Sequence, residues 1–343
     1  MSIATRLLAW FDQHGRHDLP WQHPRDPYRV WLSETMLQQT QVAVVIPYFQ
    51  RFIAALPDLA ALAVAPLDDV FALWSGLGYY SRARRLRETA AICMRDHGGE
   101  LPRDFDALLV LPGIGRSTAG AILSQAHGLP YPILDGNVRR VLCRHRNVRG
   151  WPGSAATQKE LWRIARRQLP DARIADYTQA LMDLGATVCT PRTPACPSCP
   201  LRADCIAFRD GTVDQLPERK PSKALPERGV YALIARDRDG RTLLQRRPPI
   251  GVWASLWSLP EAQTIDDAEM WLQRHAHADR FEALRPIRHT FSHFHLHIHP
   301  LLWRDARAGD AIGDTDGLRW QAADALTEIA LPAPVRKLLE GLT

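Results

Sequence analysis

Four cysteines close together are the residues of this chain best suited to bind a metal centre. They follow the spacing Cys-x6-Cys-x2-Cys-x5-Cys, and the chain holds six cysteines in all. Four thiolates in so short a stretch can surround one metal group. The proline-rich segment around them is typical of a loop rather than a helix. The four residues are Cys189, Cys196, Cys199 and Cys205.

Three interpretations of this cluster are open. An iron–sulfur cluster suits the single Cys-x2-Cys pair, whereas structural zinc sites usually present two such pairs. A disulfide framework fits least, because the chain is long and shows no signal peptide, which favours a reducing, cytoplasmic compartment. We expect the two other cysteines, Cys93 and Cys143, to be buried small apolar residues. The spacing favours iron–sulfur over zinc.

Glu34 is a candidate general acid. On a helix, three of its four neighbours at spacings of three and four are large and apolar. Burial among such side chains raises the pKa of a carboxyl group, and a general acid needs a proton that is retained near neutral pH. An ordinary glutamate at the edge of an amphipathic helix is the alternative. The four neighbours are Val30, Trp31, Leu37 and Gln38.

Asp135 is a candidate anionic partner. It precedes the helical pattern Gly136-Asn-Val-Arg-Arg-Val-Leu, at the position of a helix N-cap. Backbone amides at a cap favour the ionised carboxylate, so we expect a lowered pKa. A structural cap and nothing more is the alternative. Two carboxyl groups held in opposite protonation states are typical of an acid combined with an anionic stabiliser.

The segment Leu111-Pro-Gly-Ile-Gly-Arg-Ser117 predicts a tight hairpin between two helices. Gly113 and Gly115 allow the backbone to turn, and we expect the second helix to begin at Ser117 or Thr118. Exposed amides at a helix start bind phosphate oxygens. Because the glycines do not follow a strand, the pattern disfavours a dinucleotide-binding fold.

The elements that position these residues form a mainly helical front part and an α+β rear part. Helical periodicity runs through residues 1–208. Residues 209–228 are polar and rich in proline, which is typical of a linker. Beyond it we expect paired strands on either side of a turn at Asp237–Gly240, a helix at Asp266–His277 and a strand at Phe291–Ile298. The helical segments include 42–52, 70–74, 86–93, 119–126, 138–143, 161–169 and 177–188.

Length and charge indicate a polyanion as partner. The 343 residues suit two or three domains, and no apolar run is long enough to span a bilayer, so we expect no membrane association. Residues 1–228 carry 29 Lys and Arg against 22 Asp and Glu, whereas the remainder carries 14 against 15. The basic excess therefore lies in the front part, as in nucleic-acid-binding proteins. A solvated basic face is the alternative.

The hairpin, the segment around Asp135 and the cysteine spacing together resemble the helix–hairpin–helix DNA glycosylases related to endonuclease III. Nearly the whole chain is similar to the adenine DNA glycosylase (MutY) family. That resemblance implies one 4Fe-4S cluster at the four cysteines and a monomer acting on double-stranded DNA with adenine opposite 8-oxoguanine or guanine. The matching blocks are residues 31–41, 76–84, 134–141 and 288–293.

The same resemblance implies roles for single residues. Glu34 would protonate adenine at N7, and Asp135 would stabilise the cationic sugar that remains. Ser117 stands where strand-cleaving relatives carry a lysine, so base removal without strand cleavage is expected, because serine forms no Schiff base. Tyr79 would wedge into the duplex with Gln39 beside it.

Further implied roles concern base recognition. Gln179 would read the Hoogsteen edge of adenine. Gln22 departs from relatives with arginine at that position, so the contact which that arginine makes is not expected here. The loop Phe291, Ser292 and His293 would recognise 8-oxoguanine.

The resemblance also implies a division into domains. Residues 1–25 and 131–208 would form an iron–sulfur domain, residues 26–130 a six-helix domain with the hairpin, and residues 229–343 a Nudix-like recognition domain. The helix after Asp266 lacks the glutamates that a Nudix hydrolase needs for magnesium, so we expect binding and not hydrolysis there.

Two other functions stay open on the sequence. One is a glycosylase with strand-cleaving activity on oxidised pyrimidines, which Ser117 and residues 229–343 disfavour. The other is a non-catalytic iron–sulfur sensor of DNA damage, which would leave Glu34 without a role.

Overall fold

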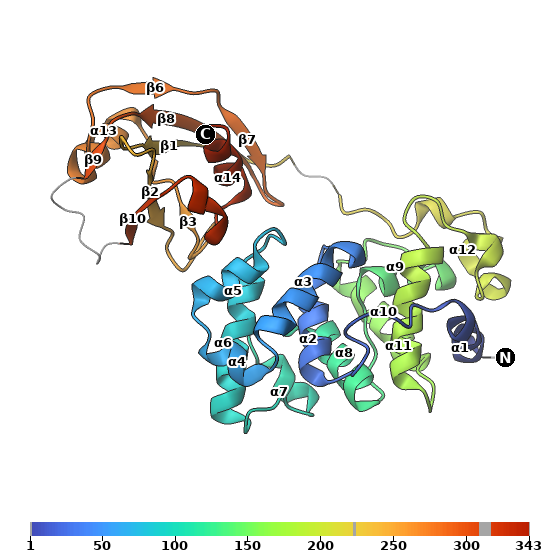
Figure 1. The fold of residues 1–343 in the computed structure, drawn as a ribbon. Coiled ribbons are helices and arrows are strands. Elements are labelled where there is room, and N and C mark those ends of the chain that lie inside the picture. The colour runs from blue at the N-terminus through green and yellow to red at the C-terminus, as the bar shows by residue number, and fades with distance from the viewer. Residues whose placement is uncertain (1, 222–223, 309–316, 343) are drawn as a thin grey trace. The chain divides into compact units, whose positions relative to one another are not determined.

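The computed structural model describes residues 2–221, 224–308 and 317–342 (Figure 1). The chain divides into two compact units. One comprises Met1–Ala65 and Arg84–Ser222, and the other comprises Pro66–Ala83 and Lys223–Thr343. Residues 222 and 223 of the expected linker and 309–316 of the expected recognition domain lie outside the described residues.

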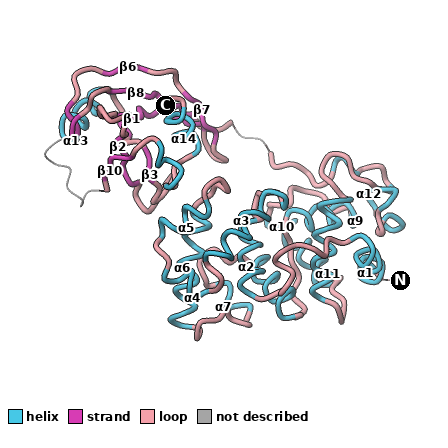
Figure 2. Tube along the Cα trace, in the orientation of Figure 1, coloured by secondary structure: helices cyan, strands magenta, loops and turns pink. Residues whose placement is uncertain are grey.

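Helices joined by short turns build the first unit, as predicted (Figure 2). Polar side chains cap many of these helices; Asp26, Asp104 and Ser154, for example, each accept a hydrogen bond from an amide of the first turn. The helices are α1 (Ile3–His14), α2 (Pro27–Met36), α3 (Val42–Ala55), α4 (Leu59–Val64), most of α6 (Ser81–Asp96), α7 (Phe105–Leu109), α8 (Arg116–Ala121), α9 (Gly136–Arg146), α10 (Ala155–Arg167), α11 (Ile174–Asp183) and α12 (Ile206–Arg209).

One core of the first unit joins the beginning of the chain to residues far along it. Leu7 and Phe11 of α1 are buried in the same cluster as Leu142 of α9, Leu161 of α10 and Tyr177 of α11. Burial of such apolar surface is the main stabilising contribution to packing. This cluster fixes α9, and with it Asp135 at the N-terminus of that helix.

The second unit contains helix α5 (Leu67–Trp74) and an α+β fold, as predicted for the rear part. The largest sheet has the order β4-β1-β8-β6, with β7 also paired to β8, and β1 and β8 are parallel. Smaller sheets have the orders β10-β2-β3 and β5-β9. The strands are β1 (Glu227–Ala235), β2 (Thr242–Arg246), β3 (Trp257–Ser258), β4 (Glu261–Ala262), β5 (Ala276–His277), β6 (Phe281–Ala283), β7 (Ile287–Thr290), β8 (His295–Trp303), β9 (Arg307–Ala308) and β10 (Leu318–Gln321).

Helices cover both faces of the largest sheet. Alternate residues of β8 point to opposite faces, so Leu296 and Ile298 join one core and Leu301 joins the other. The first core includes Val335 of α14 (Ala333–Glu340), and the second includes Leu272 of α13 (Ile265–His275).

Two expectations about the strands are wrong. The turn after β1 is present, but β1 and β2 belong to different sheets and share only the bridge between Arg236 and Thr242. The strand expected at Phe291–Ile298 begins only at His295, because Phe291 closes a tight loop by donating its amide to the carbonyl of Phe294 at 2.9 Å. His293 is therefore in a loop and not on the strand face of the later histidines.

Within the described residues, no helix is long and apolar enough to cross a membrane.

Candidate active site

Glu34 lies half-buried on α2. It contacts Gln125, which belongs to the helical segment Ile122–Ala126 that follows α8. The side-chain Nε2 of Gln125 donates a long hydrogen bond of 3.4 Å to Glu34 Oε1. Burial, and then the charge of Asp135, raise the pKa of Glu34 to about 8. The raised pKa expected from the sequence is thus present, and Glu34 retains its proton at pH 7.

Asp135 caps α9, as predicted. Its carboxylate accepts hydrogen bonds from the Val138 amide at 2.7 Å and from Asn137 Nδ2 at 3.2 Å. The expected lowering of its pKa is wrong, because burial outweighs these bonds and raises the pKa of Asp135 above its ordinary value. Sequence spacing reveals a cap but not how deeply the cap is buried.

The two carboxyl groups still ionise in a definite order. Two amides and the charge of Arg140 favour the Asp135 anion, whereas only Gln125 favours that of Glu34. Asp135 therefore ionises first, and its charge then helps to hold the proton on Glu34. The carboxyl group that ionises first and the one that retains its proton longer are thus different residues, which is the pattern of paired carboxyl groups in acid catalysis.

Ser117 links the hairpin to Asp135. Its Oγ accepts a hydrogen bond of 3.0 Å from the Leu134 amide. The helix of the hairpin begins at Arg116, one residue before the expected start, with Gly115 as its N-cap.

The two hairpin glycines have different reasons to be glycine. Gly113 has φ +82°, and a Cβ there would lie 3.1 Å from Arg85 Cβ. Gly115 has φ −93°, which any residue adopts, and a Cβ there would meet open space. Gly115 thus leaves the end of the hairpin unobstructed.

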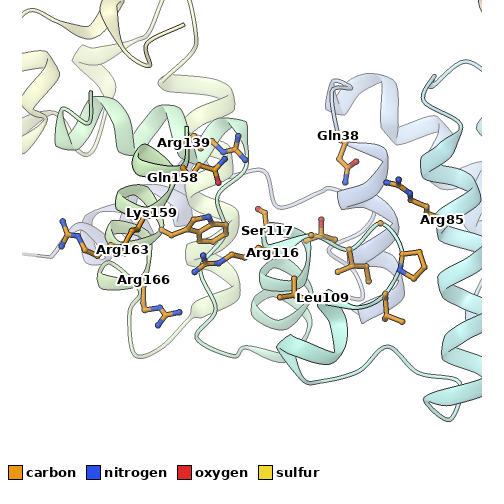
Figure 3. Close-up of a pocket in the computed structure, with 18 of the residues that line it drawn as sticks. Gln38, Arg85, Leu109, Arg116, Ser117, Arg139, Gln158, Lys159, Arg163 and Arg166 are labelled. Carbon is orange, nitrogen blue, oxygen red and sulfur yellow. The ribbon is translucent and has the colours of Figure 1, made fainter. Parts of the chain in front are cut away.

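An open groove of about 1340 Å³ runs over the hairpin (Figure 3). One wall is the hairpin with Ser117, and the other is α10. Its lining contains seven cations and no carboxylate, which suits an anionic ligand larger than a metabolite. The cations are Arg85, Arg116, Arg139, Lys159, Arg163, Arg166 and Arg167.

Gln179 lies buried on α11 with its orientation fixed. Its Nε2 donates to Asp183 Oδ1 at 2.8 Å, and the same oxygen accepts from Arg16. Gln179 Oε1 is buried without a partner in the described part of the chain, as are both amide atoms of Gln22. These atoms can bind polar groups of a ligand.

The loop after α5 presents Tyr79 to solvent. Tyr79 is 56% exposed and has φ 49°. Gly76 and Gly78 precede it, and α6 follows it. Arg82 donates to the carbonyls of Leu77 at 3.1 Å and Gly78 at 3.2 Å and lies 5.6 Å from the Tyr79 ring centroid. Trp74 Nε1 donates to the same Gly78 carbonyl. The loop is therefore rigidly held behind an exposed ring.

Gln39 follows α2 and is exposed, with φ 60°. This left-handed conformation is uncommon for a residue other than glycine and often marks a functional turn. Its neighbour Gln38 lines the groove (Figure 3).

The expected base-recognition loop lies between β7 and β8. The Phe291 ring packs on Phe294 at 4.6 Å, on His289 at 4.6 Å and on Trp253 at 5.4 Å between centroids. Ser292 and His293 are exposed at its tip. The aromatic packing under Phe291 fixes a loop whose tip is free to bind.

The four cysteines line one cavity of about 30 Å³ beside Arg144. Arg144 Nη1 lies 3.4 Å from Cys189 Sγ and donates to the carbonyl of Thr190 at 2.7 Å. No three His, Cys, Asp or Glu side chains in the described segments can hold a single metal ion. Four thiols around a common cavity are a donor set that iron–sulfur clusters and structural zinc both use. Cys93 and Cys143 are buried, as predicted.

Sequence reasoning missed several supporting residues. Gln125 is a buried amide in the otherwise mainly apolar helix Ile122–Ala126, and a glutamine in such a sequence indicates a polar partner. The spacing of Lys159, Arg163 and Arg166 was another signal. Trp253 supports the loop at Phe291 from a distant segment, and no local pattern indicates that contact.

Two family models match the chain. The model for the HhH-GPD superfamily of base excision DNA repair proteins matches residues 32–167, and the NUDIX domain model matches residues 230–341. Among solved structures, a thermostable thymine-DNA glycosylase is 28% identical, with a TM-score of 0.54 over 60% of this chain and 95% of that one. A structure of an endonuclease III–DNA complex, 24% identical with a TM-score of 0.52, shares the fold over 61% of this chain and 94% of that one.

Relatives are similar over the full length. A protein of Buchnera aphidicola subsp. Acyrthosiphon pisum named adenine DNA glycosylase is 37% identical over 99% of this chain and 97% of its own. A mouse protein of the same name is 36% identical over 98% of this chain and 77% of its own. Identity at this level across both domains confirms the resemblance drawn from the sequence. The chain belongs to the adenine DNA glycosylase family of base excision repair, whose members are hydrolases acting on N-glycosyl bonds.

Proposed function

We propose that this enzyme removes adenine that lies opposite 8-oxoguanine or guanine in double-stranded DNA, and that it does not cut the strand. The observation that carries the proposal is the pair of carboxyl groups, Glu34 with its pKa raised to about 8 and Asp135 held by amides at the N-terminus of α9. Cleavage of an N-glycosyl bond needs both a proton for the leaving base and a negative charge near the sugar.

In this reaction Glu34 donates its proton to N7 of adenine. Protonation converts the base into a neutral leaving group, and the bond between N9 and the sugar carbon breaks with its electron pair going to the base. Asp135 remains ionised and stabilises the cationic sugar until water adds to it. The hydrogen bond from the Val138 amide to the Asp135 carboxylate also fixes the direction of that carboxylate.

Ser117 supports the absence of strand cleavage. Lyase chemistry needs an amine that forms a Schiff base with the opened sugar. Ser117 offers a hydroxyl, and that hydroxyl is occupied by the Leu134 amide. The abasic site therefore stays intact until another agent cleaves it.

The groove over the hairpin is the proposed binding site of the DNA backbone. Gly113 and Gly115 expose amides at the start of α8, where phosphate oxygens bind favourably. A flipped adenine must leave a gap in the stack, and the exposed ring of Tyr79 suits that gap. We assign Gln39 to the same gap on the resemblance to the family. Gln179 Oε1 suits the exocyclic amino group of adenine, which is a hydrogen-bond donor.

The second unit supports recognition of the partner base. We assign that role to Phe291, Ser292 and His293, on the resemblance to the family and on the rigid aromatic support of the loop. The α13 sequence carries no Arg-Glu and Glu-Glu pattern for magnesium, so this domain binds without hydrolysing nucleotides.

The cysteine cavity supports one 4Fe-4S cluster, bound by Cys189, Cys196, Cys199 and Cys205. When bound, such a group supplies a rigid covalent crosslink of its loop rather than electrons for base release. Arg144 holds that loop through its carbonyls.

We further propose a monomer in the bacterial cytoplasm that associates with DNA, with residues 1–25 and 131–208 as the iron–sulfur domain. The core shared by α1 and α9–α11 supports that grouping. Residues 26–130 would form the six-helix domain, 209–228 the linker and 229–343 the recognition domain.

A product assay tests the proposal. Duplexes with adenine opposite 8-oxoguanine, guanine or thymine are incubated with excess enzyme, and half of each sample is treated with alkali. We expect breaks only after alkali, fast with 8-oxoguanine and guanine and absent with thymine. Breaks without alkali, or equal rates with thymine, would contradict it.

A further inference from the structure

One face of α10 carries three basic residues. Lys159, Arg163 and Arg166 are exposed and lie at positions i, i+4 and i+7, which places them on one side of the helix. The opposite side holds residues that anchor α10 in the core, so the basic face points away from that core. These anchoring residues are Leu161, Ile164 and Ala165.

Most of this charge is not neutralised by ion pairs among the residues that the structure describes. Arg163 is paired with Glu160. No ion pair joins Lys159 or Arg166 to a carboxylate across the described residues. Burial, and then the charge of Arg166, lower the pKa of Arg116 on the hairpin. Like charges held together in this way favour an anionic partner that relieves the repulsion.

The basic face and the hairpin form a single groove. Lys159, Arg163 and Arg166 line it with the hairpin residues Arg116 and Ser117, as Figure 3 shows. The Arg116 guanidinium lies over the ring of Trp162 on α10, 4.1 Å from its centroid, so hairpin and helix are packed together. A backbone docked at the hairpin is thus already beside α10.

We propose that Lys159, Arg163 and Arg166 form a second phosphate-binding wall, which extends the contact with duplex DNA beyond the hairpin. The inference rests on the proposed docking of DNA at the hairpin. From Lys159 to Arg166 the helix rises about 10 Å. Successive phosphates of one strand are about 3.4 Å apart along the duplex axis, so this span matches a run of about three phosphates.

The salt dependence of DNA binding directly tests whether these three side chains contact phosphates. Each neutralised phosphate contributes about 0.9 to the slope of log affinity against log salt concentration. We expect the double variant Lys159→Ala with Arg166→Ala to reduce that slope by about 1.8, measured by fluorescence anisotropy with a labelled duplex. The charge-conserving double variant Lys159→Arg with Arg166→Lys should retain the original slope.

A matched control separates local contact from total charge. Arg95 and Arg238 are exposed arginines beside aspartates and lie outside the groove. Arg95→Ala with Arg238→Ala removes the same two charges, and we expect a slope unchanged within about 0.3. Equal slopes for all variants, or equal losses for the control and the groove variant, would overturn the proposal.

A hairpin variant distinguishes this inference from the proposed docking. Gly115→Asp places a carboxylate in open space at the end of the hairpin, without backbone strain. If DNA docks there, affinity should fall at least tenfold. If Gly115→Asp bound DNA normally while the α10 variant showed a reduced slope, the hairpin docking would fail, and α10 would contact phosphates independently of the hairpin rather than extend it.

Discussion

The Ser117 hydroxyl accepts a hydrogen bond from the Leu134 amide at 3.0 Å, and Asp135 is the next residue. The hairpin proposed to dock DNA and the carboxylate proposed to stabilise the sugar are therefore connected through one side chain. This bond gives Ser117 a positioning role besides its lack of an amine.

We expect Ser117→Ala to lower the free energy of unfolding by about 1–3 kcal/mol, because the Leu134 amide loses its acceptor in a buried segment. Adenine release under single turnover should slow as Asp135 moves. Ser124→Ala is the control, since Ser124 bonds only within its own helix. Ser117→Ala with the stability and rate of the unaltered protein would remove the positioning role.

The pH dependence of adenine release should show a limb at alkaline pH. In the proposed mechanism Glu34 is the acid and must be protonated, so the rate should fall as pH rises through about 8, the pKa of Glu34. Asp135 must be ionised, so a second loss is expected at acid pH, above the ordinary range of an aspartate. Single-turnover rates from pH 4 to 10 test both limbs. A rate that is constant up to pH 10 contradicts the role of Glu34.

Glu34→Gln should stabilise the fold while it removes activity. The folded pKa of Glu34 is about 8 and its ordinary value 4.5, so the folded protein binds more protons than the unfolded chain between these values. The stability that protonated Glu34 provides is present below pH 4.5 and is lost as pH rises to 8. The variant lacks this loss, so its advantage in unfolding free energy should grow from pH 5 to pH 8 and then level off. Urea unfolding at pH 5, 6.5 and 8 measures it, and an advantage independent of pH would show that Glu34 titrates normally.

Arg82 should act on catalysis through Tyr79. Its guanidinium holds the loop carbonyls, so Arg82→Met frees the Tyr79 ring and should slow base release, with partial rescue in Arg82→Lys. A double-mutant cycle with Tyr79→Ala decides the route. If Arg82 works by positioning Tyr79, the double variant is no slower than Tyr79→Ala alone; additive losses would mean a separate role.

Local patterns predicted the helices and the cap at Asp135, because each depends on neighbours within a few residues. The raised pKa of Glu34 was predicted from its apolar helix neighbours, but the charge of Asp135, which also raises it, comes from a distant segment. The start of α8 was misplaced by only one residue, since Gly115 can serve as N-cap. What failed depends on distant contacts. The depth of burial at Asp135 and the separation of β1 from β2 arise from packing between remote segments, which spacing along the chain does not encode.

The loops show the same limit. The support of Phe291 by Trp253 joins segments more than thirty positions apart, and the position of Gln125 at Glu34 joins α2 to the end of the hairpin helix. Resemblance supplied the candidate residues there, and the structure supplied their partners.

The central claim is that Glu34 and Asp135 divide acid and anion between them. Its most direct test is the single-turnover rate of adenine release at pH 7, from a duplex with adenine opposite 8-oxoguanine, for the unaltered enzyme, Glu34→Gln and Asp135→Asn. We expect each variant to be slower by a factor of about 100 to 10,000, with DNA affinity within about threefold. A near-normal rate for Glu34→Gln with intact DNA binding would contradict the claim.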